Sequence, residues 1–533
     1  MQIQATLKRA TRWLWTTIER AVRARPGAVP VACVVLLSLA YRLHVSRECS
    51  LWLDEVSTHF DALKPWPIIL HGPSREHPPL MFVLVKVATY FLGTSETAVR
   101  SVSLFFGCLL IVAVYELCLE LGLTVWRSVI VVATLALSPF FIQQATEARM
   151  YAIFAAFCTL ATTRTLRLLR GPVRKRDLVG LAFNAVAAAA TQYFGIAYAL
   201  ALLGSSAIGV AQQWKRTATL QRLAAVAALL VSLAPLAYLT VRASALGRMY
   251  AVGASGAAAV PAINFGLLQS MLAEFSFLAN GTWSLVLQPG LSLVGLVLLT
   301  RQLRGVARML PLGLGLVPCI GALFISARHF IAARYLAPSA VLYHLGACIA
   351  LFAAADAIRF LLARGRWPAL LAPYVGGLML VGFLAARLRE YPVEFGAGCE
   401  DYRGFLRYYR AELARDTAVV SYPANFGELL LHQEYDVGRR PISLEKFRTL
   451  PGLHRYLIVV LQANAERHSE VGALLERNLG LTEQEWQSLP LLPLPRPTYQ
   501  RPVTAYLVEL PSDWVPPPRK GGRHRKGAPL RHT

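Results

Sequence analysis

Long apolar segments recur along most of this chain, from about residue 28 to residue 387. A run of roughly 20 apolar residues can cross a bilayer as a helix, because a helix pairs its backbone N–H and C=O groups internally. The chain has 533 residues, of which 55% are hydrophobic and only 16% charged, so these runs cannot all fit in the core of a soluble domain. The sequence therefore predicts a multi-pass α-helical membrane protein.

The formal net charge of +24 is concentrated in short segments between the apolar runs. This distribution is the positive-inside pattern, in which Lys and Arg mark cytoplasmic loops, and it argues against nucleic-acid binding. The basic N-terminal segment, residues 1–27, precedes an apolar run without a convincing cleavage site, so we predict a retained signal anchor with a cytoplasmic N-terminus. The other basic loops are 164–176, 212–222, 301–308 and 359–368.

The number of membrane spans must place the N-terminus and every basic loop on the cytoplasmic side. Five apolar runs lie between the cytoplasmic N-terminus and the first internal basic loop. Because that loop is also cytoplasmic, the number of crossings between them must be even, so one of the five runs cannot cross. The run 79–93 is the shortest, carries Lys86 and begins at Pro78 and Pro79, so we predict a juxtamembrane helix there, within a first outer loop of residues 45–99. The remaining spans number about eleven, and thirteen would satisfy the same parity: 28–44, 101–119, 128–144, 150–166, 178–191, 195–211, 223–241, 283–300, 309–326, 336–356 and 369–387. A second juxtamembrane helix is expected within 242–282.

After residue 387 the pattern becomes that of a soluble domain. Residues 417–422, 455–461 and 503–510 have the composition of strands, and helical patterns lie between and before them. We predict a 28–387 transmembrane catalytic domain, a small extracytoplasmic α/β domain at 388–510, and a disordered basic tail at 511–533. Cys49 and Cys399 both fall on the predicted outer side, where either a disulfide or two unpaired thiols would be compatible with the sequence.

Ionisable residues gather on the outer side of this topology. A charge at the bilayer centre costs roughly 2.5–3.5 kcal/mol on insertion scales, so such residues are expected at span ends unless a site requires them. Four segments supply acids and bases together with aromatic neighbours, which favours an active site for an anionic substrate over ordinary solvated loop charges. Their ionisable residues and tyrosines are Asp54, Glu55, His59, Glu76, His77, Glu147, Arg149, Tyr151, Arg328, His329, Arg334 and Tyr335.

Five motifs resemble those of one family. They are LWLDE (51–55), EHPPL (76–80), SPFFIQQATEARMYA (138–152), TQYFG (191–195) and ARYLAP (333–338). In this order they resemble the GT-C superfamily of membrane glycosyltransferases, and within it the protein O-mannosyltransferase and lipid A aminoarabinose transferase branch, families 39 and 83. The resemblance covers roughly residues 28–390.

The resemblance implies transfer of a sugar, by a hexosyl- or pentosyltransferase, from a polyprenyl-phosphate donor on the outer side of a bacterial inner membrane. The acceptor would be a hydroxyl group of a glycan, a lipid or a protein. The family's acidic loop residue falls on Asp54, which we expect to be the general base, since a hydroxyl nucleophile must lose its proton. Glu55 would point elsewhere in a helix and support the loop or an acceptor.

Basic groups would stabilise the departing lipid phosphate, and the candidates are Arg149, Arg334 and His77. Glu76, Glu147, Tyr151 and Tyr335 complete the expected substrate-binding set. Related chains often carry Lys where this one has His77, so a phosphate contact there depends on the protonation state of the imidazole. They also often carry His where this chain has Gln192.

No obligatory metal is expected, although some GT-C enzymes use a divalent ion, because Glu76 and His77 are adjacent and no second cluster completes a ligand set. Two other classes of protein fit the sequence less well. A transporter or flippase of lipid-linked sugars predicts ionisable or helix-breaking residues near span midpoints and two related halves, neither of which is clear here. A non-catalytic scaffold leaves Asp54 and the basic residues unexplained.

Overall fold

The structure is a computed structural model, and it describes most of the chain up to residue 363 and short parts of the remainder. The described residues are 27–48, 50–73, 77–252, 265–275, 282–326, 331–363, 417–422, 442–443, 455–460, 474–476, 479 and 504–509. The chain divides into two compact units. Unit 1 comprises Met1–Leu43, Leu70–Met81 and Val102–Leu388, and unit 2 comprises His44–Ile69, Phe82–Ser101 and Arg389–Thr533.

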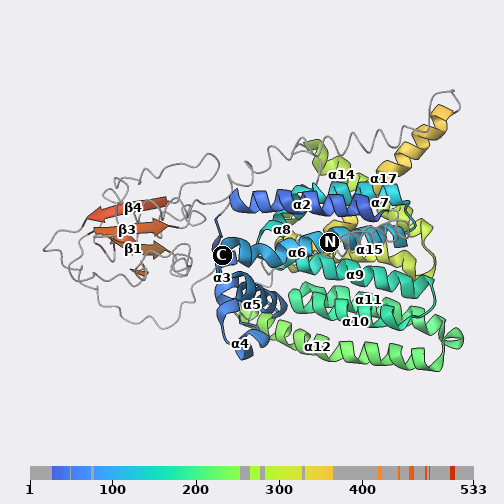
Figure 1. The fold of residues 1–533 in the computed structure, drawn as a ribbon, viewed down its shortest axis with the longest axis horizontal. Helices are drawn as coiled ribbons and strands as arrows, with labels where there is room; N and C mark the ends of the chain where they lie inside the picture. The colour runs from blue at the N-terminus through green and yellow to red at the C-terminus, as the bar shows by residue number, and fades with distance from the viewer. Residues whose placement is uncertain are drawn as a thin grey trace, which may run out of the picture. The chain divides into compact units, whose positions relative to one another are not determined.

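Unit 1 is built from helices, and the longer ones run alongside one another (Figure 1). They are α2 (Ala28–Glu48), α6 (Glu96–Glu120), α7 (Val125–Ala136), α8 (Pro139–Thr146), α9 (Tyr151–Arg170), α10 (Lys175–Thr191), α11 (Phe194–Gln212), α12 (Thr219–Val252), α13 (Phe265–Glu274), α14 (Thr282–Gln302), α15 (Met309–Gly315), α16 (Val317–Ile325) and α17 (Ala337–Ala363). Three short 3₁₀ helices connect them: η1 (Trp214–Arg216), η2 (Gly305–Arg308) and η3 (Ala333–Leu336).

Helix α9 packs against α10 and α11, and α14 packs against α17. The second pair touches through glycines: a Cβ atom on Gly295 of α14 would lie 1.8 Å from the carbonyl oxygen of Gly346 on α17. Small residues let membrane helices approach backbone to backbone, where dispersion contacts replace the hydrophobic driving force that lipid removes.

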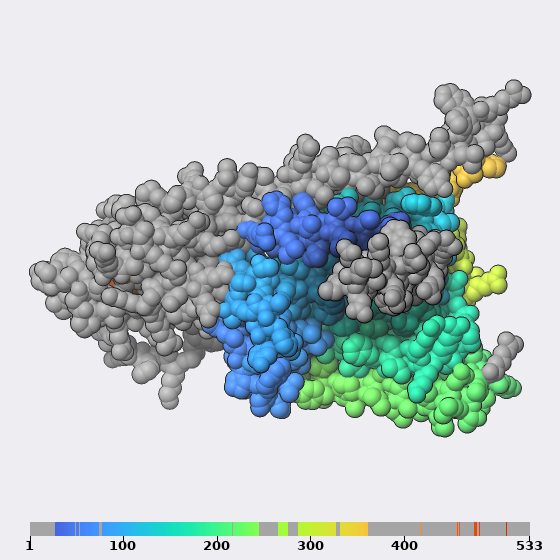
Figure 2. All heavy atoms as spheres, viewed as in Figure 1, coloured from blue at the N-terminus to red at the C-terminus, as the bar shows by residue number. Residues whose placement is uncertain are grey.

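The multi-pass architecture is confirmed. Within the described residues, seven helices are long and apolar enough to cross a membrane, or eight if the bent pair α7 and α8 counts as one span. Helix α12 forms an outer edge of unit 1 in the space-filling view (Figure 2). Leu220, Val231 and Val241 of this helix are exposed. An exposed apolar face of this kind suits contact with lipid.

The predicted spans fall on described helices, except for 369–387, which lies outside the described residues. The predicted count of eleven to thirteen is larger than the seven or eight that qualify. Helix α10, for example, has 17 residues. That is shorter than the roughly 20 residues of an untilted span.

One predicted span is wrong in its continuity. We expected a single helix over 128–144, but the chain bends by 62° between α7 and α8. The break comes just before Pro139, which has no N–H for the helical ladder and disfavours helical geometry at Ser138.

Unit 2 contains α3 (Leu53–Leu63), α4 (Trp66–Leu70), most of α5 (Leu80–Leu92) and the first residues of α6. The short helix expected over 79–93 is present as α5, with 13 residues. Its C-terminal end exposes Tyr90, Phe91 and Leu92. Aromatic and apolar side chains exposed on a helix too short to span are typical of a helix at the membrane interface.

The C-terminal part of unit 2 contains a four-stranded sheet in the order β2-β1-β3-β4. Strand β1 (Thr417–Tyr422) is parallel to β2 (Ile442–Ser443) and β3 (Arg455–Val460), and β4 (Thr504–Glu509) is antiparallel to β3. The three predicted strands are therefore confirmed. The flanking helices, the tail and both Cys49 and Cys399 lie largely or wholly outside the described residues, so the α/β domain, its boundaries and the disulfide stay predictions.

Candidate active site

In unit 1, three separate segments bring predicted site residues together. Arg149 lies between α8 and α9, Arg334 lies in η3, and His77 precedes α5. Nη2 of Arg149 is 3.2 Å from Nε2 of His77. A guanidinium has no hydrogen-bond acceptor, so Nε2 of His77 accepts this bond and the ring carries its proton on Nδ1.

The imidazole of His77 is held neutral. Burial, followed by the positive charges of Arg149 and Arg334, lowers the pKa of His77 to about 3. Nδ1 is buried and has no hydrogen-bond partner in the part of the chain that the structure describes. A buried donor without a partner costs about 1–3 kcal/mol, and such a cost is common where a ligand supplies the missing acceptor.

The ring of Tyr151 contacts both guanidinium groups. Its centroid is 6.0 Å from Cζ of Arg149 and 5.6 Å from Cζ of Arg334, and it stacks on Tyr335 with centroids 5.7 Å apart. Phe194 also contacts Tyr335, with ring centroids 6.1 Å apart. Tyr151 is fully buried, and its hydroxyl has no hydrogen-bond partner among the described residues. The aromatic rings fix the two cations in place through cation–π contacts.

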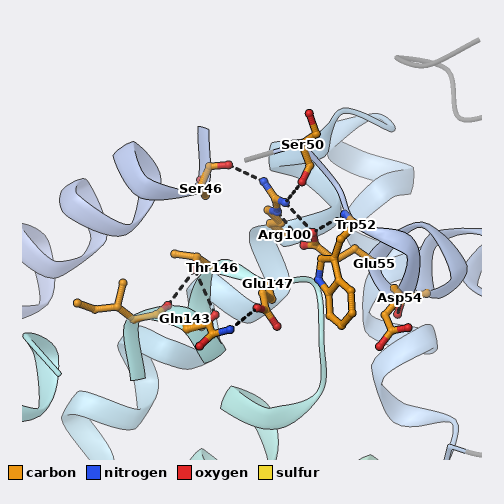
Figure 3. Close-up of polar contacts among 11 residues, drawn as sticks. Ser46, Ser50, Trp52, Asp54, Glu55, Arg100, Gln143, Thr146 and Glu147 are labelled. Carbon is orange, nitrogen blue, oxygen red and sulfur yellow. Dashed lines mark hydrogen bonds and ion pairs between the residues drawn. The ribbon is translucent and has the colours of Figure 1, made fainter. Parts of the chain in front are cut away.

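The backbone around Arg149 is fixed by α6 and α8. Ser103 of α6 donates a hydrogen bond to the carbonyl oxygen of Arg149 at 2.9 Å, and the N–H of Arg149 bonds to the carbonyl oxygen of Glu147 at 2.7 Å. Glu147 ends α8, and its carboxylate accepts a bond from Gln143 at 2.9 Å (Figure 3). The side chains of Glu147 and Arg149 are each only 6% exposed, so this turn places charges in a low-dielectric environment.

A residue that our sequence analysis missed belongs to the same unit. A Cβ atom on Gly72 would lie 2.6 Å from the guanidinium of Arg242 on α12, and Gly72 has a φ of +85°. Only glycine adopts that backbone conformation readily and has no Cβ atom to collide with the guanidinium. Arg242 lies in the second half of a long apolar helix, and an isolated arginine in such a segment is the signal that would have singled it out.

In unit 2, the acidic pair opens α3. Asp54 and Glu55 occupy the first turn of the helix, where the helix dipole favours negative charge. Glu55 accepts a hydrogen bond from the N–H of Trp52 at 3.2 Å, as the second half of a capping box does. The segment is therefore helical, which is the condition under which we expected the side chain of Glu55 to point away from that of Asp54.

Glu55 is paired with Arg100, a second residue that the sequence analysis missed. Nε and Nη2 of Arg100 donate to the two carboxylate oxygens of Glu55 at 2.8 and 2.6 Å. Arg100 also donates to the carbonyl oxygens of Ser46 and Ser50, and both charged side chains are buried (Figure 3). These contacts are those of a residue that fixes the loop between α2 and α3, while any part that Glu55 has in activity stays a prediction.

Asp54 has a different environment from its neighbour. Its side chain is half-buried and turned away from Arg100 (Figure 3), and its carbonyl oxygen accepts a bond from Thr58 at 2.8 Å. His59, one turn further on, is buried, and burial lowers the pKa of its imidazole. Adjacent carboxylates on one helix thus separate into a buried, paired glutamate and a more accessible aspartate.

Lys86 fixes the other end of α3. Its ammonium group donates to the carbonyl oxygens of Ala62 at 3.2 Å and Lys64 at 2.8 Å, and lies 5.4 Å from the ring centroid of Trp66. The last carbonyl groups of a helix lack partners within it, and a cation there also suits the helix dipole. The charge that made 79–93 a poor span therefore caps the helix that carries Asp54.

Three further predicted residues, Glu76, Arg328 and His329, lie outside the described residues. Gln192 is buried and its side chain accepts a bond from the N–H of Tyr193 at 2.9 Å, which is a local structural contact. Among the residues that the structure describes, no three His, Cys, Asp or Glu side chains converge as a metal-binding set. The absence of an obligatory metal stays a prediction.

The backbone resembles that of known membrane glycosyltransferases. It matches the crystal structure of ArnT from Cupriavidus metallidurans bound to undecaprenyl phosphate with a TM-score of 0.52, over 91% of this chain and 98% of that one, at 14% identity. The chain has the GT-C fold. This agreement over nearly both full lengths confirms the fold that the motifs implied.

Two further GT-C structures match less well. The archaeal oligosaccharyltransferase AglB from Archaeoglobus fulgidus, in complex with an inhibitory peptide and a dolichol-phosphate, gives a TM-score of 0.48 at 14% identity, covering 85% of this chain and 71% of that chain. The Pmt1-Pmt2 protein O-mannosyltransferase complex of S. cerevisiae, bound to the sugar donor, gives 0.33 at 17% identity, covering 41% and 33%. No protein-family model and no curated protein sequence matches the chain.

Proposed function

We propose that this protein transfers a sugar from a polyprenyl-phosphate-linked donor to the hydroxyl group of a glycan, lipid or protein acceptor. The observation that carries the proposal is the arrangement of Arg149 and Arg334 around Tyr151, with His77 hydrogen-bonded to Arg149. Positive charges with apolar walls, in a GT-C bundle, suit an anionic headgroup on an apolar lipid.

Phosphate binding is the role proposed for the two arginines. When the bond between the anomeric carbon and the phosphate oxygen breaks, that oxygen keeps the electron pair and the lipid phosphate gains negative charge. Guanidinium groups stabilise this charge by charge-assisted, forked hydrogen bonds. The ring of Tyr151 contacts both guanidiniums and stacks on Tyr335, and the buried hydroxyl of Tyr151 offers one further donor.

Asp54 is the proposed general base. The acceptor oxygen forms a bond to the anomeric carbon and passes its proton to the Asp54 carboxylate. Asp54 is the carboxylate of the pair that Arg100 does not hold in the bidentate contact, so it retains the exposure that a base needs. Glu55 and Lys86, at opposite ends of α3, would then keep Asp54 in position.

The proposed location is the inner membrane of a bacterium, with the transfer reaction on its extracytoplasmic side. The basic loops support this orientation, because they assign the opposite ends of the helices to the cytoplasm. Donors on that side reach the enzyme as polyprenyl-phosphate sugars carried in the outer leaflet.

The test is transfer by the purified full chain in nanodiscs. A panel of hexosyl and pentosyl undecaprenyl phosphates would be offered with extracted envelope glycans, lipids and proteins from cells lacking the gene. We expect release of undecaprenyl phosphate that depends on one donor and one acceptor class. Binding of a donor without any release, together with its movement between leaflets in vesicles, would instead support a flippase.

A further inference from the structure

The hydrogen bond between Arg149 and His77 has only one possible direction. Arginine donates and never accepts, so Nε2 of His77, 3.2 Å from Nη2 of Arg149, must hold a free lone pair. An imidazolium has protons on both nitrogens and would meet this guanidinium proton to proton. The geometry therefore fixes His77 as a neutral ring with its proton on Nδ1.

The surroundings of His77 maintain this state. Burial of the ring acts most strongly, and the cations of Arg149 and Arg334 further oppose a positive charge on it. The second nitrogen, Nδ1, is buried without a hydrogen-bond partner within the described ranges. The ring thus carries no charge and has one buried N–H group without a hydrogen-bond partner among the described residues.

A neutral donor at this position changes which phosphate the site prefers. A sugar–phosphate–lipid donor is a phosphodiester with one negative charge, whereas the lipid phosphate product is a monoester that approaches two near pH 7. By Coulomb's law an added cation attracts the product about twice as strongly as the donor. A site without that cation holds the product less tightly relative to the donor.

We propose that His77 serves as an uncharged hydrogen-bond donor in the phosphate site, which lets the site bind the phosphodiester donor while releasing the doubly charged polyprenyl phosphate product readily. This inference rests on the proposed function. It gives a specificity role to His77, which occupies the place where related chains often carry a lysine. The neutral side chain at this position would make release of the product easier.

The experiment measures undecaprenyl phosphate binding to the purified full chain by thermal shift, between about pH 5.5 and pH 8, which brackets the ordinary imidazole pKa of about 6.5. His77→Gln keeps a neutral donor and an acceptor for Arg149, so we expect its affinity to stay within about threefold of wild type and to follow the same pH course. His77→Lys adds the cation, and we expect about tenfold tighter binding and stronger product inhibition. His71→Gln, at an exposed histidine of the same segment, is the matched control.

The proposal is overturned if wild-type affinity falls relative to His77→Gln as the pH rises through about 6.5, because a protonated imidazole would then be the ligand. It is also overturned if His77→Gln abolishes binding while His77→Lys binds with the same affinity as wild type, because a charged group at this position would then be required. Should His77→Lys fail to fold, the comparison of wild type with His77→Gln decides alone. A failure of wild type to bind undecaprenyl phosphate at any pH would instead remove the proposed function, and this inference with it.

Discussion

Arg100 and Glu55 form a buried, two-pronged ion pair in unit 2, with nitrogen–oxygen distances of 2.8 and 2.6 Å. The pair joins α6 to the first turn of α3, and Arg100 also holds two backbone carbonyl groups before that turn. Since Asp54 is the residue next to Glu55, the orientation of the proposed base depends on an arginine distant in sequence.

Breaking this pair should be costly. Glu55→Gln and Arg100→Met each leave one buried charge or polar group without its partner, and we expect a loss of about 3–5 kcal/mol in stability, measured as a fall in thermal midpoint. The control is Arg127→Met, which removes the exposed pair with Asp356 and should cost about 1 kcal/mol or less. Equal effects at both sites would contradict the structural role given to Arg100.

Asp54→Asn should leave the protein folded and able to bind undecaprenyl phosphate, yet lower transfer by about 100-fold or more, since a general base contributes roughly 10²–10⁴. The comparison is Asp61→Asn on the same helix, where the carboxylate pairs with half-exposed Lys64 and no catalytic role is assigned. Near-normal turnover of the purified Asp54→Asn protein would exclude this residue as the base.

Arg149→Lys and Arg334→Lys conserve charge but lose the planar fork, and neither ammonium can stack on Tyr151 as a guanidinium does. We expect each variant to need about tenfold more donor for half-maximal rate, since the lost forked bond is worth on the order of 1–2 kcal/mol. Rates across donor concentrations measure this. Lysine variants that match wild type at low donor would show that the arginines only anchor helix ends.

The predicted topology can be tested by cysteine labelling in a background without the native cysteines. An impermeant reagent added outside should label His71→Cys, in the first loop, and should not label Lys175→Cys, in the basic loop 164–176; both native side chains are exposed. Gln144 is also assigned to the outer side, but it is buried and a cysteine there would be protected regardless of topology. Labelling in the reverse pattern would mean that the orientation is inverted.

Helix packing offers a test that does not depend on function. Gly295→Ala places a methyl group against the backbone of α17 and should destabilise the bundle by about 1–3 kcal/mol, whereas Gly290→Ala on the same helix meets no atom within 4 Å and should be neutral or slightly stabilising. Thermal unfolding in one detergent compares the two. A similar midpoint for both would contradict the close contact of α14 with α17.

Hydropathy alone determined the architecture of this protein, because the cost of placing polar backbone and charge in lipid acts locally on each segment. The apolar runs predicted described helices from α2 to α17, and the three C-terminal strands fall where their composition placed them. The same local reasoning identified α5 as too short to span, and it indicated that Asp54 and Glu55 would diverge if their segment were helical, as it is. The bend before Pro139 could have been anticipated from that residue but was not.

Pairing between distant residues was decided only by the tertiary structure. Arg100, Arg242 and Lys86 were visible as charges in apolar segments. Nothing local showed that Arg100 pairs with Glu55, that Arg242 lies against Gly72, or that Lys86 caps α3. The state of His77 is the clearest case. Its sequence position left the charge of the imidazole open, and the direction of one hydrogen bond from Arg149 settled it, because a guanidinium can only donate.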